Sequence, residues 1–356
     1  MANIKMTELL IYFFISSAFT IFLFKVLMID NNNFLKIYDY PNSRKIHKNK
    51  ILKIGGVGII FSSLFVLLIY RFNNEENLFA IHQSESIFVL SAFFLLSGAL
   101  FDDIIGINAP KKLFFQLIAI CTIVSSGFIF EIFNTYFVNY ILTIVLFILI
   151  INSMNLIDGV DGLSVSLLLV LIVFSLIISC YIPILNSKYH IIISIFSGAF
   201  FAFLFFNFPP AAIFLGDTGS QSLGWIFALF VIHFASFFDY PNQKLYILSF
   251  VSLPFYDVFF VMFKRFYSSN LSFIKRMLRV VEPDQNHIHH LLLKSNFSHK
   301  HCTLLLTSFY FLCSCISMIP ILINKFYLLV FVVVLVLNIL FRIFFEYKSN
   351  ISNEVK

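Results

Sequence analysis

The stretch Asn155-Leu156-Ile157-Asp158-Gly159-Val160-Asp161-Gly162 separates two apolar runs, residues 137–151 and 163–184. Amide and carboxylate side chains beside a bilayer need a solvated cavity, a counter-ion or a function. Tight turns also favour Asn, Asp and Gly, so a water-facing turn between two helices is the alternative. Both interpretations place a polar junction between two apolar helices. The spacing of the acids differs from that of an EF-hand, which argues against a calcium loop.

The composition of the whole chain fits this view of the junction. Of the 356 residues, 60% are hydrophobic and only 12% are charged, and the mean hydropathy is +0.94. Soluble domains are about half apolar and about one quarter charged. The chain is therefore predicted to be an all-α polytopic integral membrane protein. Its five cysteines lack metal-type spacing and are interpreted as small hydrophobic residues.

The apolar runs predict about eleven transmembrane helices. Their approximate ranges are 9–29, 54–70, 87–101, 113–133, 137–151, 163–184, 191–206, 223–238, 245–263, 303–323 and 326–345. The first run has no small-residue cleavage site after it, so we interpret it as a retained span and not as a signal peptide. Because the runs 87–101 and 137–151 are short, a total of about ten spans is the alternative.

The basic residues predict the orientation of these helices. With eleven spans, 19 of the 24 lysines and arginines fall on one side of the membrane, which the positive-inside rule identifies as the cytoplasm. The N-terminus is then outside and the C-terminus is cytoplasmic. We expect one transmembrane domain over residues 1–345, with a large cytoplasmic loop at 266–301, and a short polar cytoplasmic tail at 346–356.

Asp102 and Asp103 end one of the apolar runs on the predicted cytoplasmic side. Two unit charges about 4 Å apart repel by roughly 1 kcal/mol in water and by roughly 4 kcal/mol near a protein surface. A divalent cation, a lysine or a shared proton would offset this repulsion, and a shared proton would make one carboxylate a candidate base. The alternative is that both carboxylates face water at the end of a helix.

Two further acids lie at or within later apolar runs. Asp217, flanked by Gly216 and Gly219, could hold Mg²⁺, which takes one or two carboxylates and completes its shell with water and phosphate. A helix start with Ser220 as the N-cap is the structural alternative, and the two can coexist. Asp257 should face the protein interior, because a carboxylate at the bilayer centre costs about 2.5 to 3.5 kcal/mol. It could pair with a neighbouring helix or act as a ligand.

The large loop carries His287, His289 and His290, which could bind zinc or phosphate. Helical spacing would place His287 and His290 on one face and His289 on another. Three ligands would then not converge, so a phosphate-binding role fits better than zinc.

The first cytoplasmic loop carries Arg44, Lys45 and His47 and is followed by Gly55 and Gly56. The basic residues could bind pyrophosphate oxygens or, as positive-inside anchors, lipid headgroups. We expect the glycines to allow close helix packing.

Taken together and in this order, five stretches resemble the polyprenyl-phosphate N-acetylhexosamine-1-phosphate transferases, glycosyltransferase family 4. They are residues 39–56, 102–103, 155–162, 214–220 and 287–290. The resemblance extends over residues 8–345. The sequence His-Ile-His-His is closer to the undecaprenyl-phosphate GlcNAc-1-phosphate transferase branch than to the phospho-N-acetylmuramoyl-pentapeptide transferases. The chain departs from the family at Leu52 and Gln285, where proline and arginine are usual, and in a longer loop between 265 and 287.

The resemblance implies transfer of an N-acetylhexosamine 1-phosphate from a UDP-sugar to undecaprenyl phosphate, with release of UMP, as the first membrane step of a cell-envelope polysaccharide such as lipopolysaccharide O-antigen. It implies Mg²⁺ as the cofactor, with Mn²⁺ as a substitute. It places the protein in a bacterial inner membrane, with the active site at the cytoplasmic face. The bilayer is an expected partner and nucleic acid is not. The resemblance is also compatible with a homodimer. The catalytic candidates are Asp102, Asp103, Asp158, His289 and His290, the substrate-binding candidates are Arg44, Lys45, His47, Asn155, Asp161 and His287, and the metal-binding candidates are Asp217 and Asn155.

Other functional classes fit the sequence less well. A multi-span transporter would place acids at the midplane and show two related halves, but here the halves show no symmetry and the acids gather at one interface. The CDP-alcohol phosphotransferases require Ala-Arg shortly after Asp-Gly, where this chain has Leu163-Ser164. A catalytically silent scaffold remains compatible with the sequence. For the transferase, we expect the carboxylates and imidazoles to converge on one cation-binding site at the inner leaflet.

Overall fold

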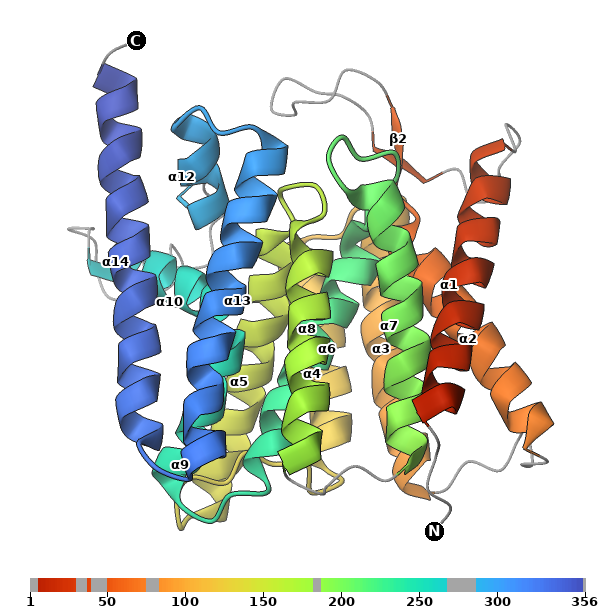
Figure 1. Cartoon of the computed structure of the whole chain (residues 1–356), viewed down its shortest axis with the longest axis horizontal. Coiled ribbons are helices and arrows are strands. Elements are labelled where there is room, and N and C mark those ends of the chain that lie inside the picture. The colour runs from red at the N-terminus through yellow and green to blue at the C-terminus, as the bar shows by residue number, and fades with distance from the viewer. Residues whose placement is uncertain are drawn as a thin grey trace. The chain divides into compact units, whose positions relative to one another are not determined.

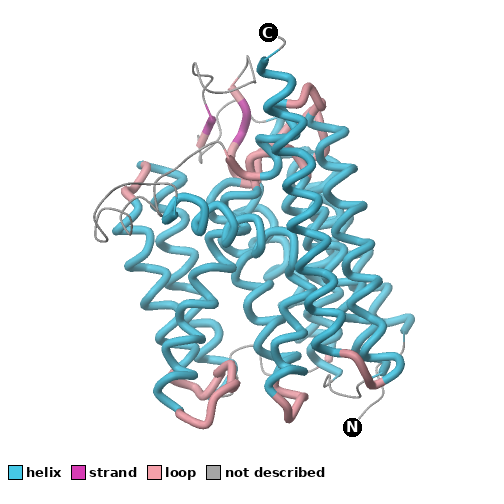
Figure 2. The backbone as a smooth tube through the Cα atoms, turned by 90° about the vertical axis from the view of Figure 1, so that its left-hand side faces the viewer, coloured by secondary structure: helices cyan, strands magenta, loops and turns pink. Residues whose placement is uncertain are grey.

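The computed structural model describes residues 6–29, 37–39, 50–74, 83–181, 187–267 and 286–354, and most of them are helical (Figure 2). The chain divides into two compact units. Unit 1 comprises Met1–Gly127 and Ile172–Leu223, and unit 2 comprises Phe128–Leu171 and Gly224–Lys356. The helices α6 and α8 each contribute one part to each unit.

Ten helical segments in the described ranges are long and apolar enough to cross a membrane. In unit 1 they are α1 (Met6–Ile29), α2 (Gly55–Asn73), α3 (Gln83–Ile105) and α7 (Ser187–Asn207). The shared helices are α6 (Leu163–Tyr181) and α8 (Gly216–Ala235). In unit 2 they are α5 (Tyr136–Ile157), α13 (His299–Ile323), α14 (Tyr327–Glu354) and the combined segment of α9 (Pro241–Tyr246), η1 (Ile247–Val251) and α10 (Ser252–Tyr267). The all-α polytopic membrane class is confirmed, whereas the total of eleven spans and the side of each terminus stay predictions.

The helix α4 (Ala109–Val124) is shorter than the apolar run that predicted it. Its 16 residues extend for about 24 Å at 1.5 Å per residue, less than the roughly 30 Å hydrocarbon core. The helix ends in two turn residues, Ser125 and Ser126, followed by Gly127, whose φ of 86° is in the left-handed region. We expected 87–101 and 137–151 to be the short runs, but α3 and α5 have 23 and 22 residues.

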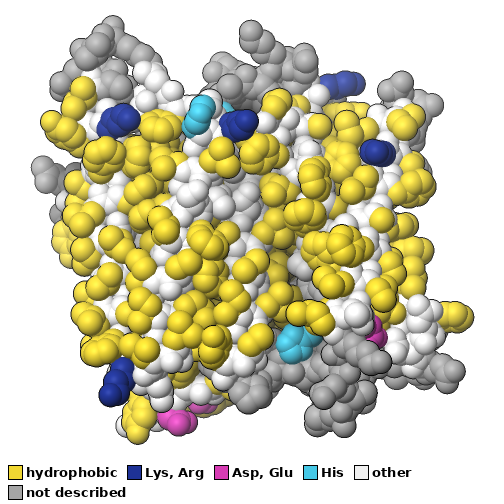
Figure 3. Space-filling view, in the orientation of Figure 1, with side chains coloured by type: hydrophobic (Ala, Val, Ile, Leu, Met, Phe, Trp, Pro, Cys, Tyr) yellow, Lys and Arg dark blue, Asp and Glu magenta, His cyan; other side chains and the backbone are white. Residues whose placement is uncertain are grey.

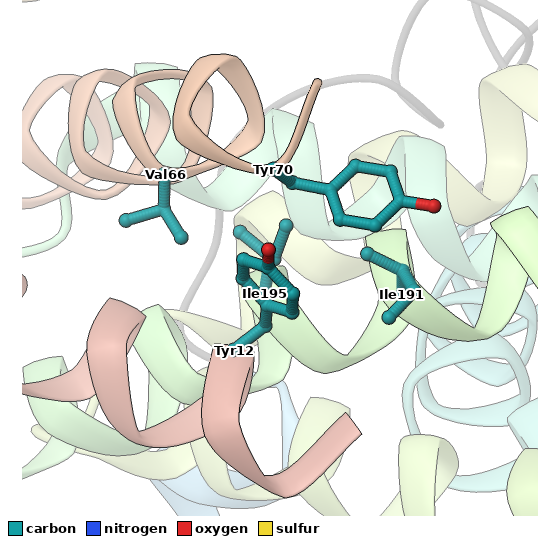
Figure 4. Packing of buried hydrophobic residues seen from close by; sticks show 5 residues of the cluster. All are labelled: Tyr12, Val66, Tyr70, Ile191 and Ile195. Carbon is teal, nitrogen blue, oxygen red and sulfur yellow. The ribbon is translucent and has the colours of Figure 1, made fainter. Parts of the chain in front are cut away.

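In unit 1, α1 packs against α2 and α7 (Figure 1). Tyr12 meets Tyr70 edge to face, with ring centroids 5.2 Å apart. Val66, Ile191 and Ile195 complete this buried cluster (Figure 4). Lipid is as apolar as the core, so the hydrophobic effect does not drive these helices together. Close van der Waals packing of such side chains stabilises unit 1 instead.

The starts of α2 and α8 lie against each other in unit 1. The short strand β2 (Ile51–Leu52), which pairs with β1 (Tyr38–Asp39), leads into α2. The N–H of Phe214 donates to the carbonyl of Leu52 at 2.8 Å, and that of Gly56 donates to the carbonyl of Leu215 at 2.7 Å. A Cβ on Gly56 would lie 2.1 Å from the nitrogen of Gly219. The expected role of this glycine in close packing is confirmed.

In unit 2, α14 packs against α9, α10, α12 (Ile288–Lys294) and α13, and α5 packs against α10 (Figure 1). The fully buried hydroxyl groups of Tyr246 and Tyr310 donate to the backbone carbonyls of Ser317 and Phe250. The helix α12 is the small element expected inside the large loop. It lies at the end of unit 2 where α13 begins.

The outward faces of the helices are hydrophobic. Hydrophobic side chains cover most of the visible surface in Figure 3, and the lysines and arginines seen there lie near helix ends. Phe22, Phe205 and Phe344 are each more than half exposed. Continuous apolar surface of this kind is suited to contact with lipid and not with water.

Candidate active site

Three carboxylates and two lysines form one cluster in unit 1, which we name the acidic cluster: Asp102, Asp103, Asp217, Lys53 and Lys112. Lys53 Nζ lies 2.8 Å from both Asp103 Oδ1 and Asp217 Oδ2. Lys112 Nζ lies 2.5 Å from Asp102 Oδ2 and 2.7 Å from Asp217 Oδ1. Each lysine therefore bridges Asp217 to one of the adjacent aspartates, and lysine is the partner that offsets their repulsion.

The turn between α3 and α4 places Asp102 and Lys112 side by side. The carboxylate of Asp102 accepts the N–H of Ile107 at 2.9 Å, and Gly106 adopts a left-handed φ of 66°. Asn108 then caps α4, which puts Lys112 in the first turn of that helix. A cation there is opposed by the positive end of the helix dipole by about 0.3 to 1 kcal/mol. The aspartates compensate for this, which points to a role for Lys112 in the site.

Asp103 holds the first turn of α8. Its side chain is 1% exposed and accepts the N–H groups of Asp217 and Thr218, both at 2.8 Å, and the hydroxyl of Thr218 at 2.6 Å. The first N–H groups of a helix lack partners within the helix. The alternative of Ser220 as the N-cap is therefore wrong, because α8 begins at Gly216 and a carboxylate from α3 caps it.

The electrostatics of the acidic cluster favour charged lysines. Burial alone would lower the pKa of Lys53, but the charges of Asp217 and Asp103 outweigh it and raise the pKa above its ordinary value. Burial likewise opposes the charge of Lys112, and Asp217 and Asp102 raise its pKa. With three carboxylates and two ammonium groups, the cluster keeps one formal negative charge when all five groups are ionised.

In unit 2, the polar junction is a short turn between α5 and α6. Asn155 lies in the last turn of α5, and Asp158 accepts a hydrogen bond from the hydroxyl of Ser164 in α6. Thr303 Oγ1 of α13 donates to the backbone carbonyl of Asp161 at 2.7 Å. The interhelical turn expected from Asn, Asp and Gly is thus observed, and α13 fixes its position.

The three histidines of the loop motif lie at the start of α12. His287 precedes the helix and has an extended backbone with ψ of 151°, so helical spacing does not apply to it. The expectation that His289 is turned away from the other two histidines is therefore wrong. The rings of His287 and His289 are instead stacked in parallel with centroids 6.1 Å apart, and that of His290 lies 4.2 Å from His289.

His289 connects the motif to the polar turn. Its side chain is buried, and neither ring nitrogen has a hydrogen-bond partner among the described residues. Burial, followed by the neighbouring histidines and Arg342, lowers the pKa of His289 well below its ordinary value. A Cβ on Gly159 would lie 2.6 Å from His289 Nε2. Glycine at 159 therefore lets the turn approach an imidazole that is neutral at physiological pH.

Asp257 faces the interior of unit 2, as expected for a carboxylate inside an apolar run. It contacts His287 of the loop motif and pairs with Arg342 of α14. The alternative of pairing with a neighbouring helix is therefore confirmed. The sequence analysis predicted neither the pairing of Asp257 with Arg342 nor the contacts of Lys53 with Asp103 and Asp217, because the partners lie far apart in the sequence.

The predicted site residues are thus distributed over both units. Asp102, Asp103 and Asp217 come together in unit 1, and His289 meets the turn that contains Asp158 and Asp161 in unit 2. The remaining substrate-binding candidates Arg44, Lys45 and His47 lie outside the described residues. Convergence of all the candidates on one site and the role of each residue stay predictions.

The acidic cluster has donors suited to a hard divalent cation. No group of three or more histidine, cysteine, aspartate or glutamate side chains is arranged around a common metal position in the described part of the chain. Mg²⁺ does not require such a group, because it commonly binds one or two carboxylates with water and phosphate. Both oxygens of Asp217 already face cations, the two lysine ammonium groups. The partly exposed carboxylates of Asp217 and Asp102 fit the ion, whereas the buried Asp103 is occupied as a cap.

Part of the chain matches one protein family, and two bacterial proteins are similar over most of its length. Residues 85–235 match the model for glycosyl transferase family 4. A probable undecaprenyl-phosphate N-acetylglucosaminyl 1-phosphate transferase of Bacillus subtilis is 25% identical over 282 residues, 75% of this chain and 73% of the relative. An undecaprenyl-phosphate alpha-N-acetylglucosaminyl 1-phosphate transferase of Thermotoga maritima is 28% identical over 290 residues, 80% of each chain. The family 4 match and these two relatives bear out the resemblance found in the motifs.

Proposed function

We propose that the protein transfers an N-acetylhexosamine 1-phosphate from a UDP-sugar to undecaprenyl phosphate, giving undecaprenyl-diphosphate-sugar and UMP. The observation that carries this proposal is the acidic cluster, in which Asp102, Asp103 and Asp217 share two lysines at one end of unit 1. The family and the names of the two bacterial relatives support it. Both of those names contain N-acetylglucosaminyl, so UDP-GlcNAc is the first donor to test.

The residues of the acidic cluster suit a reaction between two anions. A lipid phosphate and a nucleotide pyrophosphate repel each other, and catalysis of phosphoryl transfer consists mainly of positioning and charge neutralisation. Lys53 and Lys112 are held charged at the cluster and can bind phosphate oxygens. A phosphomonoester has a second pKa near 6, so the acceptor is already a nucleophile near neutral pH. A protein base is therefore dispensable, and we assign Asp102 and Asp217 to cation binding.

Magnesium is part of the proposal. Bound at Asp217, with Asp102 nearby, the ion would neutralise phosphate oxygens and polarise the bond that breaks. Asp103 would keep Asp217 in place by holding the first turn of α8. The family resemblance also implies Asn155 as a second metal ligand and Mn²⁺ as a substitute for Mg²⁺. The same resemblance places the site at the cytoplasmic face of a bacterial inner membrane, where the lipid acceptor is confined.

The decisive experiment measures UMP release by the purified protein in detergent with undecaprenyl phosphate and a panel of UDP-N-acetylhexosamines. Formation of a lipid-linked pyrophosphate sugar from UDP-GlcNAc or a related donor, abolished by EDTA and restored by Mg²⁺, is the expected result. UDP-N-acetylmuramoyl-pentapeptide belongs in the panel because exclusive use of that donor would assign the protein to the pentapeptide branch. The proposal is refuted if no UDP-sugar yields UMP while the protein remains folded.

A further inference from the structure

We propose that Asp257 and Arg342 are positioning residues for the transfer reaction: together they hold His287 and the start of α12 in the orientation that the histidine motif needs. This inference rests on the proposed function. It concerns two charged residues on transmembrane helices, outside the five stretches that carry the family resemblance.

Both oxygens of Asp257 are directed at the histidine motif. Oδ2 lies 2.8 Å from Nδ1 of His287, and Oδ1 accepts the backbone N–H of Ile288 at 3.0 Å. Ile288 is the first residue of α12, and His287 provides no side-chain cap for that helix. The carboxylate from α10 therefore satisfies a backbone N–H that would otherwise lack a partner at the helix start.

Arg342 secures the carboxylate from the other side. Its guanidinium group donates to Asp257 Oδ1 through Nη1 and to the backbone carbonyl of Asn286 through Nη2. The ring of Phe260 lies 4.6 Å from the guanidinium carbon. The arginine side chain is 5% exposed and that of Asp257 is 4% exposed. Helices α10 and α14 are thus joined to the residues on both sides of His287.

These contacts fix which nitrogen of His287 is available to a ligand. An ionised carboxylate only accepts hydrogen bonds, so Nδ1 carries the proton directed at Asp257. Nε2 is then the atom available to a ligand, and it is buried without a hydrogen-bond partner among the described residues. A carboxylate behind an imidazole sets its tautomer and ring orientation in the same way at metal sites. The ring so oriented is the one stacked on His289.

A buried ion pair that served only to join two helices would not need these additional contacts. Apolar side chains of similar volume can often replace such a pair without loss of stability. Here the small cleft beside the pair is lined by Leu253, Phe260 and Ile339, which would accommodate apolar replacements. A purely structural pair and a positioning pair therefore predict different behaviour for a double apolar variant.

The test compares the wild type with the double variant Asp257→Leu/Arg342→Met. We expect the double variant to remain folded, to exchange the backbone hydrogens of residues 286–294 faster, and to lose about 100-fold in kcat/KM for the UDP-sugar, the loss typical of a misplaced group. Hydrogen exchange followed by mass spectrometry and UMP release are the two measurements. As a matched control, Leu340→Ala, on the exposed face of α14 two residues before Arg342, should change neither.

A second set of variants covers the case in which the apolar pair does not fold. Asp257→Asn keeps the shape of the side chain but has one acceptor oxygen, so it loses either His287 or both Ile288 and Arg342. Arg342→Lys keeps the charge but not the fork that reaches Asn286. We expect both to raise exchange at the start of α12. Combining either with His287→Gln should add little further loss of kcat/KM, because the pair acts through His287.

The inference is overturned if the folded double apolar variant has the same hydrogen-exchange rates and the same kcat/KM as the wild type. It is also overturned if the losses of kcat/KM caused by these variants and by His287→Gln are fully additive. The proposed function fails separately, since a wild-type protein that releases no UMP refutes the reaction. Hydrogen exchange would still decide whether Asp257 and Arg342 order α12.

Discussion

Replacing Asp103 by asparagine separates a capping role from a catalytic one. Asp103 is 1% exposed, and its carboxylate accepts three hydrogen bonds from Asp217 and Thr218 and pairs with Lys53. Asparagine has nearly the same shape but only one acceptor oxygen. If that oxygen keeps the two bonds to Thr218, the new amide group is directed at the N–H of Asp217, and two donors then face each other.

The cost follows from the bond that is lost. A hydrogen bond to a charged acceptor contributes about 1.5 to 3 kcal/mol, and a buried donor without a partner adds to that. The weakened pairing with Lys53 contributes little more, because its side chain is 25% exposed and keeps Asp217 as a partner. We therefore expect Asp103→Asn to lower the free energy of unfolding by about 2 to 3 kcal/mol.

Unfolding of the purified protein in mixed detergent micelles measures this difference, and Asp102→Asn is the matched control. The asparagine oxygen at 102 can still accept the N–H of Ile107, so only the pairing with Lys112 is lost. That partly exposed pair contributes about 1 kcal/mol or less. An Asp103→Asn protein that unfolds like the wild type but has no transferase activity would refute the capping role. It would indicate instead that Asp103 acts directly on the substrate.

Three further outcomes follow from the geometry. Gly56→Ala should prevent correct packing of α2 on α8, because its Cβ would lie 2.1 Å from a backbone nitrogen that cannot move aside; folded yield by size-exclusion chromatography checks this. Asp217→Asn should raise the Mg²⁺ concentration that gives half-maximal UMP release, and EDTA should abolish release by the wild type. The protein should lose stability as the pH falls below about 6.5, because the unfolded chain then protonates His289 whereas the buried, pKa-lowered ring in the folded state does not. His289→Gln should reduce this loss in unfolding experiments between about pH 7.5 and pH 5.

The sequence predicted most of the helices because an apolar run long enough to cross a bilayer has few alternatives to helix. It misjudged α4, whose apolar run continues to residue 133 although the helix ends at Val124. Hydropathy does not register the serines and Gly127 that end the helix, since a short turn hardly changes the average over about 20 residues.

The sequence predicted which residues are candidates for the site, but not which side chains pair with each other. The acidic side chains are conspicuous in an apolar sequence, whereas their partners are not. Lys53 is one of several lysines in a basic loop, and Arg342 lies 85 residues after Asp257. One signal was available, because Asp257 and Arg342 are each an isolated charge inside an apolar run, and opposite charges buried in a membrane protein commonly pair.

The two motifs share one structural solution. The helix α8 begins with Gly216-Asp217-Thr218. The N–H groups of Asp217 and Thr218, which have no partner within the helix, donate to Asp103 of α3. The helix α12 begins after His287, and its first N–H is bound by Asp257 of α10. In both cases a carboxylate from another helix replaces the local N-cap that sequence rules look for. This explains why Ser220 was wrongly expected to cap α8. It also has a chemical consequence: because the capping is done from elsewhere, neither the carboxylate of Asp217 nor the imidazole of His287 caps its own helix, as the cation and phosphate binding that we propose requires.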